Sequence, residues 1–590
     1  MRREQAPDLL ELRMACLDDR LRELGAASRL LATADAQVVT HASSVAAGIA
    51  PLAACADAHA LREPTAPKRE QLAQINRISD RLAAAQVAGR AGRLKPALAE
   101  LRTLLAETRK LDYAPLESTI LLTAAHYEGQ NENEPAAEQL YIEAAAAGLR
   151  GRQDRLVALP WIALAEQFVR AERHDSASLA LLQAKAASSR VSEDLDVQIQ
   201  LGELLSMVER YGGDPNEALR IAERTLALAQ RAPDHIRGMV EALGELELAQ
   251  EVTGHHQLAT ETQRRALGLV RQEYGAEHPA TAYREQRLAG GEIQIRRSAE
   301  AQMHLLHAIG IFKQAYGEDS ISVSEGYIDL GYSALNVDPA RALSWFNLAA
   351  SLMARRSPNT RTAQLDDYLG SALQALGRLD EARDYLEQGL ALAARLDPAP
   401  TNPQALQLAI DLGSVLVDLG STQKARPLLE RALAEEENNR GTYIADALFQ
   451  LGRLESAEGH VGQARRLMER SIPLSRDDGT DTIDSIDREL SLAEVELFEA
   501  PAQALARVER IAAIPLPEPE IDDLVDRDRA HFLLAKARVA AKDPAHDLAS
   551  ALQLAHSARE GYAKRGARFG KQLAEVERWL ALNATGAKTR

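Results

Sequence analysis

Apolar and polar residues follow one another along most of the chain with the spacing of amphipathic helices, inside a longer repeat. Residues 369–393, 412–436 and 451–475 align with one another without gaps. In each copy, apolar or small side chains stand four and seven positions after a shared alanine, as Leu386 and Gly389 do after Ala382. This spacing places them on one face of an α-helix. We therefore predict that each copy is a pair of amphipathic helices.

Glycine marks two further points in each copy. One glycine precedes the shared alanine by five residues, where a turn between the two helices is expected; these are Gly377, Gly420 and Gly459. Glycine there supplies the positive φ of a helix end, and the alanine lets the second helix approach the first closely. Another glycine stands twelve residues before the alanine and is expected to be the matching small position on the first helix; these are Gly370, Gly413 and Gly452.

The same frame extends along the chain as eleven alanines spaced 39 to 43 residues apart. The series is Ala97, Ala137, Ala177, Ala218, Ala259, Ala301, Ala342, Ala382, Ala425, Ala464 and Ala504. Six of these follow a glycine by five residues, namely Gly92, Gly213, Gly254, Gly377, Gly420 and Gly459. Two turns carry an acidic residue before proline, Asp214-Pro215 and Asp338-Pro339. An acidic N-cap followed by proline is typical of a helix start.

A period near 41 residues exceeds the 34 residues of the standard tetratricopeptide unit by about two helical turns. The segments EYGAEHPATA at 273–282 and AYGEDSISVS at 315–324 resemble the link between units in the long tetratricopeptide class of kinesin light chains. HEAT repeats share this period, but the order of an L-G pair, a turn glycine and an alanine favours the tetratricopeptide class. We predict an all-α fold, a right-handed α-solenoid of about eleven to twelve helix-turn-helix repeats.

Proline-rich breaks and the chain ends suggest three parts. PAPTNP at 398–403 and PLPEPE at 515–520 are expected to be loops between repeats. RFGKQLAEVERWLALNA at 568–584 is amphipathic and is expected to cap the array. We predict an N-terminal helical joining segment at 1–66, a repeat array at 67–520, and a terminal repeat with a capping helix at 521–590.

The joining segment contains EQAPDLLELRMACLDDRLREL followed by PLAACADAHALREP. It resembles the segment between the kinase domain and the tetratricopeptide sensor region of large bacterial serine/threonine kinases, especially myxobacterial ones. The resemblance implies an upstream ATP-binding kinase domain, often followed by a membrane-spanning helix, and cysteines at the positions of Cys16 and Cys55. The chain has no Gly-rich loop, H-R-D, D-F-G or G-x-x-x-x-G-K-S/T motif, so that activity does not carry over to it.

Charge separates the N-terminal part from the rest. The net charge is -17, yet residues 1–110 carry 17 Lys and Arg against 13 Asp and Glu, leaving 52 against 73 for the remainder. An acidic body repels phosphate backbones, which argues against nucleic acid and anionic membranes as partners and favours a basic peptide or protein. The alternative is a solvated surface whose charge only keeps the protein soluble.

Targeting segments and the two cysteines bear on the cellular compartment in which the protein is expected. The chain lacks an apolar run long enough to span a membrane, and its start lacks the apolar core of a secretory signal. We expect a cytoplasmic protein, membrane-tethered if it belongs to a longer kinase. Cys16 and Cys55 are then expected to be small buried side chains. The alternative is a disulfide between two N-terminal helices, which needs an oxidising compartment.

Residues for catalysis, cofactor binding or metal binding are not predicted. His304 and His307 share a helix face and His255 and His256 are adjacent, but neither pair has a carboxylate or cysteine at ligand spacing. A G-x-S-x-G elbow is missing, and no pair of acidic residues stands out for acid–base chemistry. We therefore expect a protein that is not an enzyme and carries no cofactor.

Aromatic residues concentrate in the middle of the chain. Those that we select as candidate partner-binding residues are Tyr327, Tyr332, Trp345, Tyr368 and Tyr385. Tyrosine and tryptophan anchor many peptide interfaces. The alternative is ordinary packing between helices.

Three functional hypotheses follow. The leading one is a scaffold or sensor that binds a peptide or protein along the concave face of the solenoid. The second is a regulatory fragment of a serine/threonine kinase whose phosphotransfer domain lies upstream. The third is end-to-end self-association of solenoids. The sequence leaves the oligomeric state and the residues that line the groove open.

Overall fold

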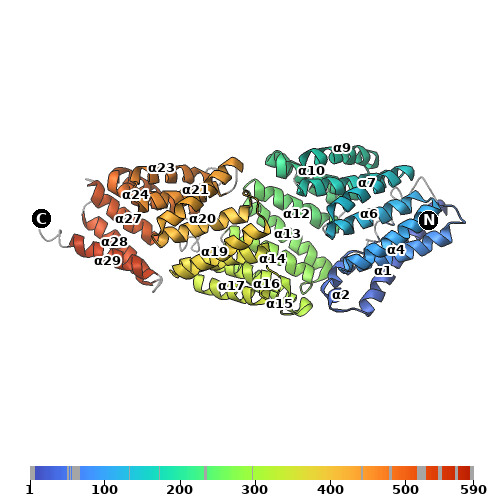
Figure 1. Cartoon of the computed structure of the whole chain (residues 1–590), viewed down its shortest axis with the longest axis horizontal. Helices are drawn as coiled ribbons and strands as arrows, with labels where there is room; N and C mark the ends of the chain where they lie inside the picture. The colour runs from blue at the N-terminus through green and yellow to red at the C-terminus, as the bar shows by residue number, and fades with distance from the viewer. Residues whose placement is uncertain are drawn as a thin grey trace, which may run out of the picture. The chain divides into compact units, whose positions relative to one another are not determined.

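The computed structural model describes residues 7–49, Leu52, Cys55, 67–131, 133–171, 173–231, 236–295, 297–439, 443–476, 482–514, 527–542, 548–564 and 569–584. Within these residues the chain forms 28 α-helices and no strand (Figure 1). The prediction of an all-α solenoid of helix-turn-helix repeats is confirmed. The described part includes no helix that is both long and apolar enough to cross a membrane.

The chain divides into two compact units. Unit 1 comprises Met1–Gly291 and Gly310–Glu318, and unit 2 comprises Glu292–Ile309 and Asp319–Arg590. Unit 1 begins with α1 (Pro7–Ala32), α2 (Ala36–Thr40) and α3 (Ala42–Ala47). Its helix pairs are α4 (Leu72–Arg90) with α5 (Leu94–Leu111), α6 (Ala114–Gln130) with α7 (Glu134–Arg150), α8 (Asp154–Arg170) with α9 (His174–Ser188), α10 (Leu195–Gly212) with α11 (Pro215–Ala229), and α12 (Ile236–Val252) with α13 (His256–Tyr274).

The division between the units falls within α14 (Pro279–Gln294) and α15 (Ser298–Tyr316). The pairs of unit 2 are α16 (Ile321–Ala334) with α17 (Pro339–Met353), α18 (Thr360–Ala375) with α19 (Leu379–Leu396), α20 (Pro403–Asp418) with α21 (Thr422–Asn439), α22 (Ile444–Ala457) with α23 (Val461–Leu474), α24 (Ile483–Glu499) with α25 (Pro501–Ala512), and α27 (Arg527–Ala541) with α28 (Leu548–Lys564). The last helix is α29 (Gly570–Ala584), in which Val576 is buried in one cluster with Phe532 and Tyr562.

The alanine series marks the buried face of the second helices. Each of the eleven alanines lies in the second helix of a pair, and none is more than 6% exposed. The opposing glycines are where the first helix comes closest: a Cβ added at Gly413 would lie 2.5 Å from Leu429 Cδ2. The same holds at Gly370, where the contact is with Leu386 Cγ at 2.5 Å. The expectation of small residues at these positions is confirmed.

The turn glycines have the predicted backbone. Gly377, Gly420 and Gly459 have φ of 73°, 71° and 84°. Gly213 differs, with φ of -118°, and the residue after it caps the next helix: Asp214 Oδ1 accepts the N–H of Asn216 at 2.9 Å. Asp338 caps α17 in the same way, accepting the N–H of Arg341 at 3.0 Å.

The two links that resemble kinesin light chains lie between helices, as predicted. Helix α13 ends at Tyr274 and α14 begins at Pro279, while α15 ends at Tyr316 and α16 begins at Ile321. The loop at 398–403 leads into α20, where Asn402 caps the helix. The segment at 515–520 and the boundaries predicted after 66 and 520 lie outside the described residues.

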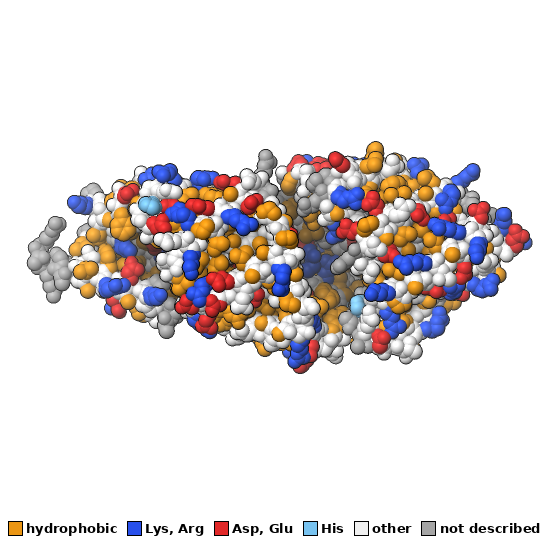
Figure 2. Space-filling model, in the orientation of Figure 1, with side chains coloured by type: hydrophobic (Ala, Val, Ile, Leu, Met, Phe, Trp, Pro, Cys, Tyr) orange, Lys and Arg blue, Asp and Glu red, His pale blue; other side chains and the backbone are white. Residues whose placement is uncertain are grey.

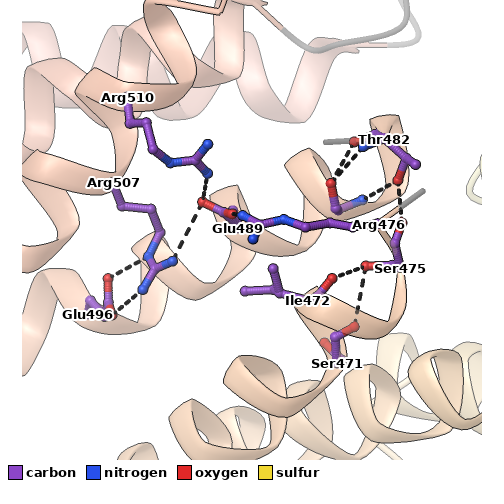
Figure 3. Close-up of polar contacts among 10 residues, drawn as sticks. Ser471, Ile472, Ser475, Arg476, Thr482, Glu489, Glu496, Arg507 and Arg510 are labelled. Carbon is purple, nitrogen blue, oxygen red and sulfur yellow. Dashed lines mark hydrogen bonds and ion pairs between the residues drawn. The ribbon is translucent and has the colours of Figure 1, made fainter. Parts of the chain in front are cut away.

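Buried ion pairs join the last repeats of unit 2 (Figure 3). Glu489 on α24 is 2% exposed and contacts three arginines: Arg476 at 2.9 Å, Arg507 at 3.5 Å, and Arg510. Arg507 also donates two hydrogen bonds to Glu496, at 3.0 and 3.1 Å. Because each buried carboxylate has a guanidinium partner, the charges are compensated inside the array.

The N-terminal helix is attached to the first repeat. Arg22 Nε lies 2.9 Å from Asp80 Oδ1 on α4. Cys16 on α1 forms a disulfide with Cys55, with Cα atoms 5.6 Å apart. Of the two states that the sequence left open for these cysteines, the structure has the disulfide.

Candidate functional site

A large cavity in the described part of unit 1 lies between helices far apart in sequence. It has a volume of about 1360 Å³, with α4 and α6 on one side and α12, α13 and α14 on the other. Figure 2 shows this face hollowed at that place, with basic side chains inside the hollow. The residues used below from its lining are Tyr127, His126, Arg237, Val240, Glu241, Tyr274, His278 and Arg284.

A smaller hollow of about 290 Å³ continues it along the first helices of the next repeats. It is lined from α8, α10, α12 and α14 and shares Val240, Glu241 and Arg284 with the larger one. We call the two together the inner groove. Its apolar lining comes from Ile162, Leu204, Met207, Val240 and Leu248.

Four glutamates, Glu166, Glu203, Glu241 and Glu245, line the smaller hollow. Three of them are paired with arginines of the same unit. The contacts are Arg170 Nη2 to Glu166 Oε1 at 2.6 Å, Arg237 Nε to Glu241 Oε1 at 2.9 Å, and Arg210 Nη2 to Glu245 Oε1 at 3.5 Å. The lining therefore carries both signs of charge.

Glu203 differs from the other three glutamates. Its Oε1 is shielded from solvent and has no hydrogen-bond partner among the described residues. Burial raises the pKa of Glu203 to about 8, and the negative charges of Glu241 and Glu245 add to the rise. The side chain is therefore mostly protonated at neutral pH unless a cation binds beside it.

Arg284 on α14 is the positively charged counterpart of Glu203 in the lining of the groove. Burial, followed by repulsion from Arg287, lowers the pKa of the Arg284 guanidinium. Arg287 is paired with Glu247 at 2.5 Å, whereas no ion pair within 4 Å joins Arg284 to a described residue. A half-buried guanidinium in this state is ready to bind an anionic group.

Aromatic and imidazole side chains line the larger cavity. The rings of Tyr274 and His278 stack with centroids 5.0 Å apart. The Tyr127 hydroxyl donates to the carbonyl of Gln86 at 2.7 Å. Burial lowers the pKa of both His126 and His278, which favours the neutral imidazole. This part of the groove offers flat, uncharged surfaces beside the charged ones.

The five aromatic residues selected from the sequence lie in unit 2, not in this groove. Tyr327 and Trp345 stack at 5.5 Å, and the ring of Tyr368 lies 5.3 Å from that of Tyr332. Tyr327, Tyr368 and Tyr385 pack against the core cluster of α16 to α18. Tyr332 is 48% exposed and is the member of the set that a partner would reach most readily.

The histidines and the acidic clusters provide little for a metal ion. His304 Nε2 lies 3.8 Å from Glu292, a carboxylate that spacing along the helix did not indicate, and His255 contacts Thr253. Glu455, Glu458 and His460 come together in unit 2. There Arg426 contacts both glutamates at 2.6 Å, so a guanidinium already supplies the positive charge.

Sequence reasoning missed Glu203 and Arg284. Both stand on first helices, and Glu203 directly follows Gly202, where a Cβ would lie 2.1 Å from Thr225 Oγ1. The repeat phase could therefore have placed Glu203 beside the contact between its helix pair. It could not show that the groove leaves this carboxyl without a partner.

Comparison with known proteins finds one family match, in unit 2. Residues 361–434, which span α18 to α21, match the family model of the tetratricopeptide repeat. No curated protein matches the sequence. The chain thus contains a tetratricopeptide region in unit 2, as predicted.

Several solved structures resemble parts of the chain. BtubC (BKLC) from P. vanneervenii is 19% identical with a TM-score of 0.33, covering 40% of this chain and 91% of its own. A variant of a putative kinesin light chain from P. anserina, with nearly identical TPR-like repeats, is 20% identical with a TM-score of 0.31, covering 34% and 97%. A Rap protein complexed with competence and sporulation factor is 13% identical with a TM-score of 0.39, covering 60% and 99%.

Proposed function

We propose that the chain is a protein-interaction scaffold whose inner groove binds a peptide or a segment of a partner protein. The observation that carries this proposal is the pair Glu203 and Arg284. Buried polar groups are normally satisfied within a protein, yet among the described residues Glu203 Oε1 has no hydrogen-bond partner and Arg284 has no ion pair. A partner that supplies the missing charges would compensate their desolvation on binding.

The chemistry of the groove specifies the partner further. A lysine or arginine of the partner fits against Glu203, where Glu241 and Glu245 add negative charge. A carboxylate of the partner fits against Arg284. The acidic composition of the chain steers a basic partner toward it and disfavours nucleic acid and anionic membranes.

The test is a peptide array probed with the whole chain and with the double variant Glu203→Gln, Arg284→Gln. Peptides that bind the wild type are expected to carry a basic residue and to lose at least tenfold in affinity for the variant. The matched control is Glu499→Gln, Arg559→Gln, which removes one exposed charge of each sign from unit 2. Equal binding by the groove variant and the control would refute the proposal.

A second candidate function is a regulatory arm of a bacterial serine/threonine kinase. It is favoured by the resemblance of segment 1–66, whose helix α1 packs directly on the first repeat through Ala26, Ala27 and Val87. In that case an upstream domain performs phosphotransfer, the chain is tethered to a membrane, and 67–520 is the sensor array. The test is the intact mass of the native protein from its own cells. A mass above 64.2 kDa by about 30 kDa or more indicates an added domain.

A further inference from the structure

Helix α1 presents an apolar stripe to solvent. Its members are 39% to 67% exposed, and they are Leu10, Met14, Leu17, Leu21, Leu24 and Leu31. Surface helices usually turn their apolar face toward the protein, and scattered exposed leucines need no explanation. Six on one face of a 26-residue helix are not scattered.

The spacing of the stripe is that of a coiled coil. Intervals of four and three residues alternate from Leu10 to Leu24, and Leu31 continues the pattern one heptad later. Leucine occupies every d position (Leu10, Leu17, Leu24, Leu31), while Met14, Leu21 and Ser28 occupy the a positions. A seam of about three heptads is at the length that coiled coils require, and leucine at d is typical of parallel two-stranded ones.

Other contacts hold α1 so that this stripe faces outward. Arg22 reaches α4, with Nε 2.9 Å from Asp80 and Nη2 3.0 Å from Asn76. Ala26 and Ala27 are buried against α4, and Cys16 is tied to Cys55. The packing of α1 on the repeat array thus uses the opposite side of the helix and leaves the seam accessible.

The charges that flank the seam select one occupant and one orientation. Arg13 stands at g and Asp18 at e, five residues later. In a parallel, in-register pair of α1 helices, g of one helix faces e five residues later on the other, so Arg13 meets Asp18 twice by symmetry. In an antiparallel pair, g positions face g positions, so Arg13 would not meet Asp18.

We propose that α1 is a dimerisation helix and that its seam is covered by α1 of a second copy of the chain, parallel and in register. This goes beyond the binding function of the inner groove and differs from end-to-end stacking of solenoids. The dimer would present two grooves to one partner, which raises the apparent affinity for bivalent ligands.

Sedimentation equilibrium of the whole chain tests the proposal. The wild type is expected to approach twice 64.2 kDa with rising concentration, and Leu21→Glu, Leu24→Glu to remain at 64.2 kDa. The control is Leu179→Glu, Leu182→Glu on α9, two leucines at the same three-residue spacing and 63% and 62% exposed, which should leave the dimer intact. A wild type that stays monomeric throughout, or a dimer that survives Leu21→Glu, Leu24→Glu, overturns the proposal.

Two further variants test the orientation. Leu24→Cys should form an intermolecular disulfide on mild oxidation, because residue 24 faces its own copy only in the parallel register. Asp18→Arg should weaken the dimer at least tenfold without affecting the fold, since Asp18 is exposed and lies outside the packed face of α1. A dimer that is disrupted by Leu21→Glu, Leu24→Glu but neither crosslinks nor responds to Asp18→Arg overturns the parallel arrangement.

Discussion

The carboxyl group of Asp367 on α18 hydrogen-bonds to that of Asp411 on α20, the first helix of the following repeat. Burial raises the pKa of Asp367 well above its ordinary value and that of Asp411 to about 6. The Gln407 amide donates to Asp411 Oδ2 at 2.7 Å, which favours the ionised form of Asp411. The two carboxyls therefore share a proton over a range of pH in which isolated aspartates are ionised.

This pair predicts a pH-dependent stability. Because the folded pKa values are raised above the unfolded value of about 3.9, the stabilisation is complete below that pH and is lost as the pH rises through about 6. Asp367→Asn removes the charge and should raise the free energy of unfolding by roughly 1 to 3 kcal/mol at high pH, with little effect under acid conditions. Urea unfolding at several pH values measures this, with the exposed Glu261→Gln as control. A variant that is equally affected at every pH would contradict the prediction.

Within the buried ion network of unit 2, we expect the substitution of Glu489 to lower the stability most. Glu489→Gln replaces the buried carboxylate that Arg476 and Arg510 contact by a neutral amide, so we expect a loss of roughly 1 to 3 kcal/mol in the free energy of unfolding. Glu430→Gln removes one end of the exposed Arg426–Glu430 pair and should cost less than about 1 kcal/mol. Similar losses in the two variants would show that the buried network stabilises unit 2 no more than an exposed ion pair does.

Glycines within the helices are expected to differ in their tolerance of alanine. A Cβ at Gly413 would overlap Leu429, so Gly413→Ala should destabilise by roughly 1 to 3 kcal/mol. Gly268 on α13 has no atom within 4 Å of the added Cβ, and Gly268→Ala should stabilise by about 0.5 to 1 kcal/mol. Thermal unfolding of the two variants measures the difference. Effects of the same sign would contradict the assignment of Gly413 as a contact position.

The aromatic cluster of unit 2 is expected to separate into structural and accessible members. Trp345 stacks on Tyr327, so Trp345→Leu should lower the free energy of unfolding by roughly 1 to 3 kcal/mol. Tyr332 is exposed, and Tyr332→Ser should change it by less than about 1 kcal/mol. If unfolding shows this split and Tyr332→Ser also weakens partner capture, the exposed tyrosine belongs to a binding surface. A large loss of stability in Tyr332→Ser would instead assign it to packing.

The repeat architecture could be predicted because its determinants are local. Ala382 and Gly377 stand five residues apart, and each helix pair is specified by contacts within itself and with its neighbours. Gly413 faces Leu429 sixteen residues later, within one copy of the repeat. Small side chains at such positions can be recognised in a single sequence, so the helix pairs, their turns and the links between them can be predicted from the sequence.

The groove was decided by the tertiary structure. Glu203, Glu241 and Arg284 stand on three successive first helices, and each looks like an ordinary solvated charge in the sequence. The pKa values of Glu203 and Arg284 depend on desolvation by neighbouring repeats and on which charges meet across the groove, and neither is encoded locally.

Helix α1 shows both sides of this division. The heptad spacing of Leu17, Leu21 and Leu24 is a property of the sequence. That this face stays exposed, while Ala26 and Ala27 pack on α4, is a property of the fold, because only the three-dimensional arrangement determines which side of a helix its neighbours cover.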